Sequence, residues 1–190
     1  MVAGAAGIML GSMSALVLSG LAGSLRLGSE VDIGGWQSDF AVGSEAADRY
    51  TRARIARHGL LALARTEAVY FVRDVDDRGR ALTNDCRYRV AGGDLPAEWW
   101  SITLYDGDSM LPANDDDALS VDATVLGEGA WDAIIAPSRP DEQTPWISSR
   151  GAREFDLTLR LYLPEDELFE NPQASLSPPS IARLDCGGGT

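Results

Sequence analysis

The two cysteines are the residues whose chemistry is easiest to define. The 190-residue chain contains only Cys86 and Cys186, no CxxC motif and a single histidine, His58. A structural zinc site needs about four cysteine or histidine ligands, so this class of site is excluded. If the domain is exported to an oxidising compartment, we expect a Cys86–Cys186 disulfide. The alternative is a pair of reduced, unrelated thiols.

Other reactive side chains show no catalytic pattern. The sequence lacks a Gly-x-Ser-x-Gly motif that could pair a serine with His58, and it has neither a Walker loop nor a dinucleotide-binding glycine pattern. A carboxylate pair for glycoside hydrolysis is left open, because the sequence does not fix carboxylate separations. An acidic cluster does not fit the calcium-loop spacing and is interpreted as a solvated loop; its members are Asp106, Asp108, Asp115, Asp116, Asp117 and Asp122. We therefore expect no catalytic residue, no metal and no cofactor, and the sequence favours a non-enzymatic role over an enzymatic one.

Aromatic residues provide the candidate contact surface. Trp99, Trp100, Tyr105 and Trp146 could stack on a sugar-like ligand or contact a partner protein. Side chains alternate along a strand, so one of the adjacent tryptophans, Trp99 or Trp100, must face away from the core if the strand is regular. The alternative for all four rings is ordinary packing in the core or under a helix.

The charge balance restricts the partners. The net charge is −13, and all 16 basic residues are arginines. A nucleic-acid-binding protein needs a basic face that releases counterions from phosphates, so nucleic acid is not expected as a partner.

The first 25 residues are predicted to form a transmembrane helix. Residues 2–25 carry no charge, and a helix of that length reaches roughly 35 Å, enough for a bilayer core. A cleaved signal peptide and a buried soluble helix are the alternatives. Small residues at four-residue steps could form a helix-packing stripe toward other membrane subunits; they are Ala3, Gly7, Gly11, Ala15, Ser19 and Gly23.

The remaining chain is predicted to be one β-rich domain. Residues 26–43 are interpreted as a linker, residues 44–186 as the domain and residues 187–190 as a flexible tail. Ser44 is a good N-cap for an amphipathic helix that packs on the sheets. Alternating or β-rich segments predict strands, and short strands with frequent turns indicate an antiparallel β-sandwich; the segments are 68–72, 86–90, 100–104, 131–136 and 155–163.

Three segments together resemble a known bacterial family. The segments are residues 50–71, residues 99–106 with the sequence Trp-Trp-Ser-Ile-Thr-Leu-Tyr-Asp, and residues 155–164. Their order and spacing are similar to the family called domain of unknown function 1214, in particular its short, membrane-anchored type. The resemblance implies a jelly-roll-like β-sandwich but no activity. The chain departs from the family pattern at residues 114–120 and at Trp146-Ile147-Ser148, so no functional residue is carried over.

These observations predict a function class rather than a reaction. We expect a domain in the bacterial periplasm, anchored in the inner membrane, that serves as a non-catalytic accessory or assembly subunit of a membrane complex. The alternative is a periplasmic enzyme or binding domain for a small or sugar-like ligand, which predicts a concave pocket lined by tryptophans.

Overall fold

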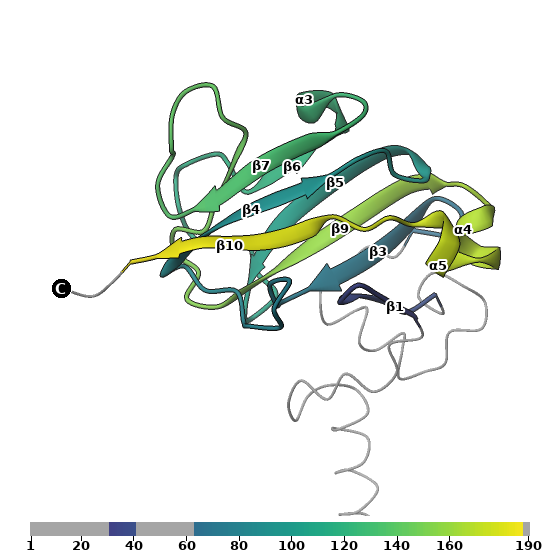
Figure 1. The fold of residues 1–190 in the computed structure, drawn as a ribbon, viewed down its shortest axis with the longest axis horizontal. Helices are drawn as coiled ribbons and strands as arrows, with labels where there is room; N and C mark the ends of the chain where they lie inside the picture. The colour runs from purple at the N-terminus through teal and green to yellow at the C-terminus, as the bar shows by residue number, and fades with distance from the viewer. Residues whose placement is uncertain (1–30, 41–62, 188–190) are drawn as a thin grey trace, which may run out of the picture.

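The computed structural model describes residues 31–40 and 63–187, which form two β-sheets and three short helices (Figure 1). The six-stranded sheet has the order β1-β2-β3-β9-β5-β6, and the four-stranded sheet has the order β10-β4-β7-β8. The strands are β1 (Val31–Ile33), β2 (Trp36–Ser38), β3 (Ala68–Arg73), β4 (Cys86–Gly92), β5 (Ala97–Asp106), β6 (Ser120–Asp122), β7 (Trp131–Ala136), β8 (Trp146–Ser148), β9 (Phe155–Pro164) and β10 (Ser180–Cys186). The helices are α3 (Ala123–Leu126), α4 (Glu167–Glu170) and α5 (Pro172–Ser175).

The five strands predicted from sequence are confirmed as β3, β4, β5, β7 and β9. Strand β4 has the simplest pattern: Cys86, Tyr88 and Val90 are buried, whereas Arg87 and Arg89 are exposed. Period-2 alternation of this kind gives a strand one apolar face and one polar face. The mainly β fold class follows from repeating this pattern in several strands.

The two sheets enclose one apolar core. Phe71, Ile102 and Leu159 from the six-stranded sheet belong to the same buried cluster as Val90 and Ile135 from the four-stranded sheet. Tyr88 of β4 contacts Phe155 of β9 edge-to-face, with ring centroids 5.8 Å apart. Close packing of this kind holds the two sheets in one relative position.

The prediction of a purely antiparallel arrangement is wrong for one pair of strands. β7 and β8 are parallel, with Ile135 opposite Ile147. The loop between them, residues 137–145, returns the chain to the same end of the sheet, and the Trp146 ring N–H donates to the Ala136 carbonyl oxygen at 2.9 Å. The four-stranded sheet is therefore mixed.

Two short strands lie within the segment interpreted as a linker. β1 and β2 form a hairpin in which Gly34 and Gly35 both have positive φ, 60° and 86°. Glycine adopts this region without a steric penalty. The Trp36 ring is fully buried, and its N–H donates to the Pro179 carbonyl oxygen at 2.8 Å, which ties the hairpin to the segment before β10.

Several expectations fall on parts of the chain that lie outside the described residues. They are the transmembrane helix 1–25 with its small-residue stripe, the helix beginning at Ser44, His58, and most of the tail. Within residues 31–40 and 63–187, no helix combines the length and the apolar character needed to cross a bilayer.

Candidate functional site

The six-stranded sheet carries a group of aromatic and polar side chains on the face turned away from the core. We call it the outer-face cluster. Its members come from three adjacent strands, and each of them is partly buried. They are Tyr70 of β3, Trp99, Thr103 and Tyr105 of β5, and Arg160 and Tyr162 of β9.

Strand register places these side chains on one face. Arg160 is paired with Tyr70 on one side, and Tyr162 is paired with Trp99 on the other. Residues opposite one another in a sheet project to the same side, as do residues two apart along one strand. Thr103 and Tyr105 therefore share the face with Trp99. The Trp99 and Tyr162 rings lie 5.2 Å apart between centroids, at a tilt of 58°.

Arg160 organises the centre of the outer-face cluster. Its guanidinium donates to Thr103 Oγ1 at 2.9 Å and to the Tyr105 hydroxyl. Its Cζ also lies 5.3 Å from the Tyr105 ring centroid and 5.9 Å from the Tyr70 centroid, within the range of cation–π contacts. These hydroxyl and ring partners are neutral, and they orient the side chain.

The electrostatics of the cluster reflect partial burial beside this cation. Burial raises the pKa of Tyr70, Tyr162 raises it further, and the Arg160 charge opposes the increase. Within residues 31–40 and 63–187, no carboxylate forms an ion pair with Arg160. Because Arg160 has no ion-pair partner among the residues that the structure describes, an external carboxylate could complement its charge.

The structure brings together two of the four aromatic residues proposed as a contact surface. Trp99 and Tyr105 lie in the outer-face cluster. Trp100 instead points into the core and is only 5% exposed, because it is one residue out of phase with Trp99. Trp146 lies at the edge strand β8 of the other sheet, partly buried. The sequence prediction missed Tyr70, Arg160 and Tyr162, although the alternation in residues 155–163 already placed Arg160 and Tyr162 on the polar side.

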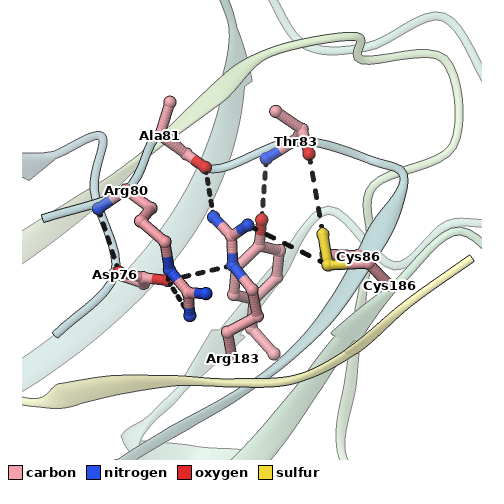
Figure 2. The surroundings of a disulfide bond; sticks show 8 residues. Asp76, Arg80, Ala81, Thr83, Cys86, Arg183 and Cys186 are labelled. Atoms are coloured by element: carbon pink, nitrogen blue, oxygen red, sulfur yellow. Dashed lines mark hydrogen bonds and ion pairs between the residues drawn. A yellow bond between two sulfur atoms is a disulfide. The ribbon is translucent and has the colours of Figure 1, made fainter. Parts of the chain in front are cut away.

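The two cysteines form the expected disulfide. Cys86 and Cys186 lie directly opposite one another on the neighbouring strands β4 and β10. Figure 2 shows Arg183 lying between this disulfide and Asp76. Arg183 Nη1 is 3.9 Å from Cys186 Sγ, Nη2 donates to the Ala81 carbonyl oxygen at 2.6 Å, and Cζ lies 5.3 Å from the Tyr88 ring centroid.

Asp76 is a buried carboxylate with a structural role. Its Oδ1 accepts backbone N–H bonds from Arg78 and Arg80, and its Oδ2 accepts from Arg80 Nε at 2.9 Å. Burial alone would raise its pKa, but the backbone N–H bonds from Arg80 and Arg78, with the Arg80 side chain, hold the pKa below its usual value. Arg183 Nε lies 2.9 Å from Oδ2 without the alignment of a hydrogen bond, so their contact is an ion pair only. These bonds fix the turn beside the disulfide.

The acidic loop residues mostly satisfy backbone or arginine groups. Asp106 Oδ1 accepts from the backbone of Met110 at 2.9 Å, and Asp122 caps α3 through the N–H groups of Thr124 and Val125. Arg150 and the Ser148 hydroxyl both donate to Asp116 and hold the pKa of that carboxyl below its usual range. These contacts join loops and do not converge on a reactive centre.

The described residues contain no arrangement suited to metal binding. Within them, no group of three or more histidine, cysteine or acidic side chains is placed to hold an ion. One open depression is lined by Asp132, Asp141, Glu142, Gln143, Thr144 and Pro145, none of them aromatic.

Comparison with known proteins identifies relatives of unknown function. The family model described as "Protein of unknown function (DUF1214)" matches residues 67–166. The chain is similar to the crystal structure of the VPA0106 protein from Vibrio parahaemolyticus, with 21% identity and a TM-score of 0.58, covering 73% of this chain and 36% of that chain. It also matches a putative uncharacterized protein from Burkholderia cenocepacia with 13% identity and a TM-score of 0.42, covering 62% and 29% of the two chains. No curated protein matches. At these identities, the likeness to VPA0106 shows a shared fold.

Proposed function

This chain belongs to the DUF1214 family of proteins of unknown function, and we propose that it is a periplasmic accessory or assembly domain that recognises another subunit of an inner-membrane complex. The domain is non-catalytic in this proposal. Residues 1–25 anchor it in the membrane, and the stripe of small residues along them packs against other membrane helices. A jelly-roll-like connection of the sheets and a helix from Ser44 packed on them belong to the same proposal.

The outer-face cluster is the observation that supports this function. Tryptophan, tyrosine and arginine are the residues most enriched among those that dominate binding energies at protein interfaces. The cluster presents all three on a rigid sheet face, where Trp99 contacts Tyr162 and Tyr105 holds Arg160. A rigid, pre-oriented surface loses little conformational entropy when a partner binds.

The charge of Arg160 defines the chemistry of the partner. Its hydrogen-bond partners in the cluster are hydroxyl groups, and its ring contacts are with tyrosines. A carboxylate brought by the partner subunit would supply a counter-charge, and a partly desolvated pair of this kind favours correct register at an interface. The partner surface is therefore expected to present an aspartate or glutamate.

The disulfide supports the proposed compartment. Both cysteines of the sequence are used in one bond, Cys86–Cys186. Such bonds persist in oxidising compartments such as the bacterial periplasm and are rare in the cytosol. This observation agrees with an anchor that places residues 44–186 outside the cytoplasm.

The alternative of a sugar-like ligand receives less support. It requires a concave pocket lined by tryptophans, whereas Trp100 and Trp131 stack on one another in the core with ring centroids 4.5 Å apart. The depression lined by Asp132 and residues 141–145 carries no tryptophan. Partner recognition by the outer-face cluster is the better explanation of the aromatic residues that do face outward.

Site-specific photocrosslinking in intact membranes tests the proposal. A photoreactive phenylalanine analogue replaces Tyr105 in the full-length protein, and a matched variant carries it at Arg89, which is exposed on the outer side of the other sheet. We expect a cross-link to a membrane subunit from position 105 only, and its loss when Arg160→Ala is added. Equal cross-linking from both positions, or none from position 105, would contradict the proposal.

A further inference from the structure

The two cysteines of the disulfide are unequally exposed. Cys86, at the start of β4, is 4% exposed, whereas Cys186, at the end of β10, is exposed. β10 is an edge strand of the four-stranded sheet, and within residues 31–40 and 63–187 no further strand pairs with its outer side. Thiol–disulfide exchange requires a thiolate to approach one sulfur in line with the bond that breaks. Cys186 is the more exposed of the two cysteines, so it is the one that an external thiolate would approach.

The groups beside the two sulfur atoms favour attack at Cys186 and departure of Cys86 as a thiolate. The Arg183 guanidinium lies 3.9 Å from Cys186 Sγ, the sulfur of the more exposed cysteine. On the other side, the Thr83 hydroxyl donates to Cys86 Sγ at 3.9 Å (Figure 2). A cation at the attacked sulfur attracts a thiolate, and a donor at the departing sulfur stabilises the thiolate that leaves.

Arg183 is held in this position by several independent contacts. Its guanidinium bonds to the Ala81 carbonyl oxygen, pairs with Asp76 and lies over the Tyr88 ring. Tyr88 is itself fully buried, and its hydroxyl accepts the Thr83 backbone N–H at 2.9 Å. The cation and the Thr83 hydroxyl are therefore parts of one connected structure and do not depend on a mobile surface side chain.

We propose that the Cys86–Cys186 disulfide is a site of thiol–disulfide exchange in the folded protein, attacked at Cys186 by an external thiolate. The thiolate forms a new bond to Cys186 Sγ, the Cys86–Cys186 bond breaks, and its electron pair leaves on Cys86 as a thiolate. Cys186 then carries the external thiol as a mixed disulfide, and Cys86 takes up a proton from water or attacks the adduct to restore the original bond. This gives the domain a reversible covalent attachment point for a thiol-bearing molecule, in addition to its proposed partner surface.

The experiment measures exchange of the purified full-length protein with reduced glutathione, which carries a net negative charge, and with cysteamine, whose thiolate form carries none. The variants are Arg183→Gln, Thr83→Val and the control Arg87→Gln. Arg87 neighbours Cys86 in the same strand, but its side chain is exposed on the opposite face of the sheet. Peptide mapping by mass spectrometry locates the adduct.

We expect the glutathione adduct on Cys186, formed at a rate that low denaturant concentrations do not change. Arg183→Gln should slow glutathione exchange about five-fold and cysteamine exchange less than about two-fold, because one nearby charge is removed. Thr83→Val should slow exchange with both thiols by about three-fold, the effect of one weak hydrogen bond. Arg87→Gln should react at the wild-type rate.

Three results would overturn the proposal. The first is an adduct on Cys86. The second is an exchange rate that rises with denaturant in parallel with unfolding, which would show that only the unfolded chain reacts. The third is equal slowing by Arg183→Gln and Arg87→Gln. Arg183→Gln removes the ion pair with Asp76 and could lower stability. In that case, the denaturant measurement and the Thr83→Val variant still test whether the folded protein exchanges.

Discussion

Trp100 stacks on Trp131 across the interface between the two sheets, with ring centroids 4.5 Å apart and an angle of 28° between the planes. Trp100 belongs to β5 of the six-stranded sheet and Trp131 to β7 of the four-stranded sheet. The Trp131 ring N–H donates to the Gly93 carbonyl oxygen at 2.9 Å, which prevents the ring from shifting freely. This pair therefore makes the neighbouring backbone of β4 sensitive to added volume.

Replacing Gly92 with alanine is expected to destabilise the fold. A Cβ at this position would lie 2.6 Å from Trp131 Cζ2, a distance that forces the ring or the backbone to move. We expect Gly92→Ala to lower the free energy of unfolding by about 2 kcal/mol, measured by urea denaturation. Gly93→Ala is the matched control, because nothing lies within 4 Å of its added Cβ. Equal stability of the two variants would refute the described packing.

The buried Trp36 hydrogen bond gives a second prediction. The ring N–H of Trp36 donates to the Pro179 carbonyl oxygen at 2.8 Å, and the ring is fully buried. Trp36→Phe should cost about 2 kcal/mol, because it removes packing volume and leaves this acceptor poorly paired. Trp146→Phe removes a similar bond from a ring that is only partly buried, and water can replace the donor there. Thermal unfolding of both variants should show the larger loss for Trp36→Phe; the reverse order would be inconsistent with the structure.

The sequence was most informative where alternation was strong and least informative at edges and short pairings. β9 was predictable because five apolar residues alternate with polar ones along residues 155–163. β10 was not predicted, because as an edge strand it has one buried residue, Ile181, and several exposed polar ones. The three-residue strand β8 pairs in parallel with β7, an arrangement set by tertiary packing and not by local pattern.

The candidate site could be predicted only in part, because it depends on pairing between strands that are distant in the sequence. Alternation along the strand places Trp99 and Trp100 on opposite faces, but it does not predict which strands are neighbours in the sheet. Arg160 reaches Thr103 and Tyr105 only because β9 lies beside β5, a pairing of residues more than 50 positions apart. The disulfide was easier to predict, because the chain has only two cysteines and therefore one possible intramolecular bond.

The pH dependence of stability should reveal the role of Asp76. Its pKa in the folded protein is lower than usual, so the ionised form stabilises the fold. This contribution is fully present above the unfolded-state value of about 3.9 and is lost as the pH falls through the lower native pKa. At neutral pH, Asp76→Asn should cost about 2 kcal/mol, because its arginine partners lose their counter-charge.

Urea denaturation between neutral pH and the acid range measures this effect. The difference in stability between wild type and Asp76→Asn should shrink as the pH falls below about 4. Asp108→Asn, which changes an exposed carboxylate, is expected to keep the wild-type stability at neutral pH. A constant difference between wild type and Asp76→Asn at every pH would rule out a stabilising carboxylate at this position.

Removing the disulfide is expected to have the largest effect on stability. Cys86 and Cys186 are 100 positions apart. In the chain-entropy model, closing a loop of that size stabilises a protein by up to about 4.7 kcal/mol. The double variant Cys86→Ser/Cys186→Ser should therefore unfold at a much lower urea concentration than the oxidised wild type. A loss below about 1 kcal/mol would argue against a stabilising role for the bond.

Native separation of the full-length protein extracted from its membrane tests the partner-recognition claim most directly. The wild type and Arg89→Ala should migrate in a complex with another membrane subunit, whereas Arg160→Ala should migrate without that partner and remain folded. Arg89 is a suitable control because it is an exposed arginine on the other sheet, paired with Asp132. Migration of the wild type as a lone monomer, or retention of the partner by Arg160→Ala, would contradict recognition through the outer-face cluster.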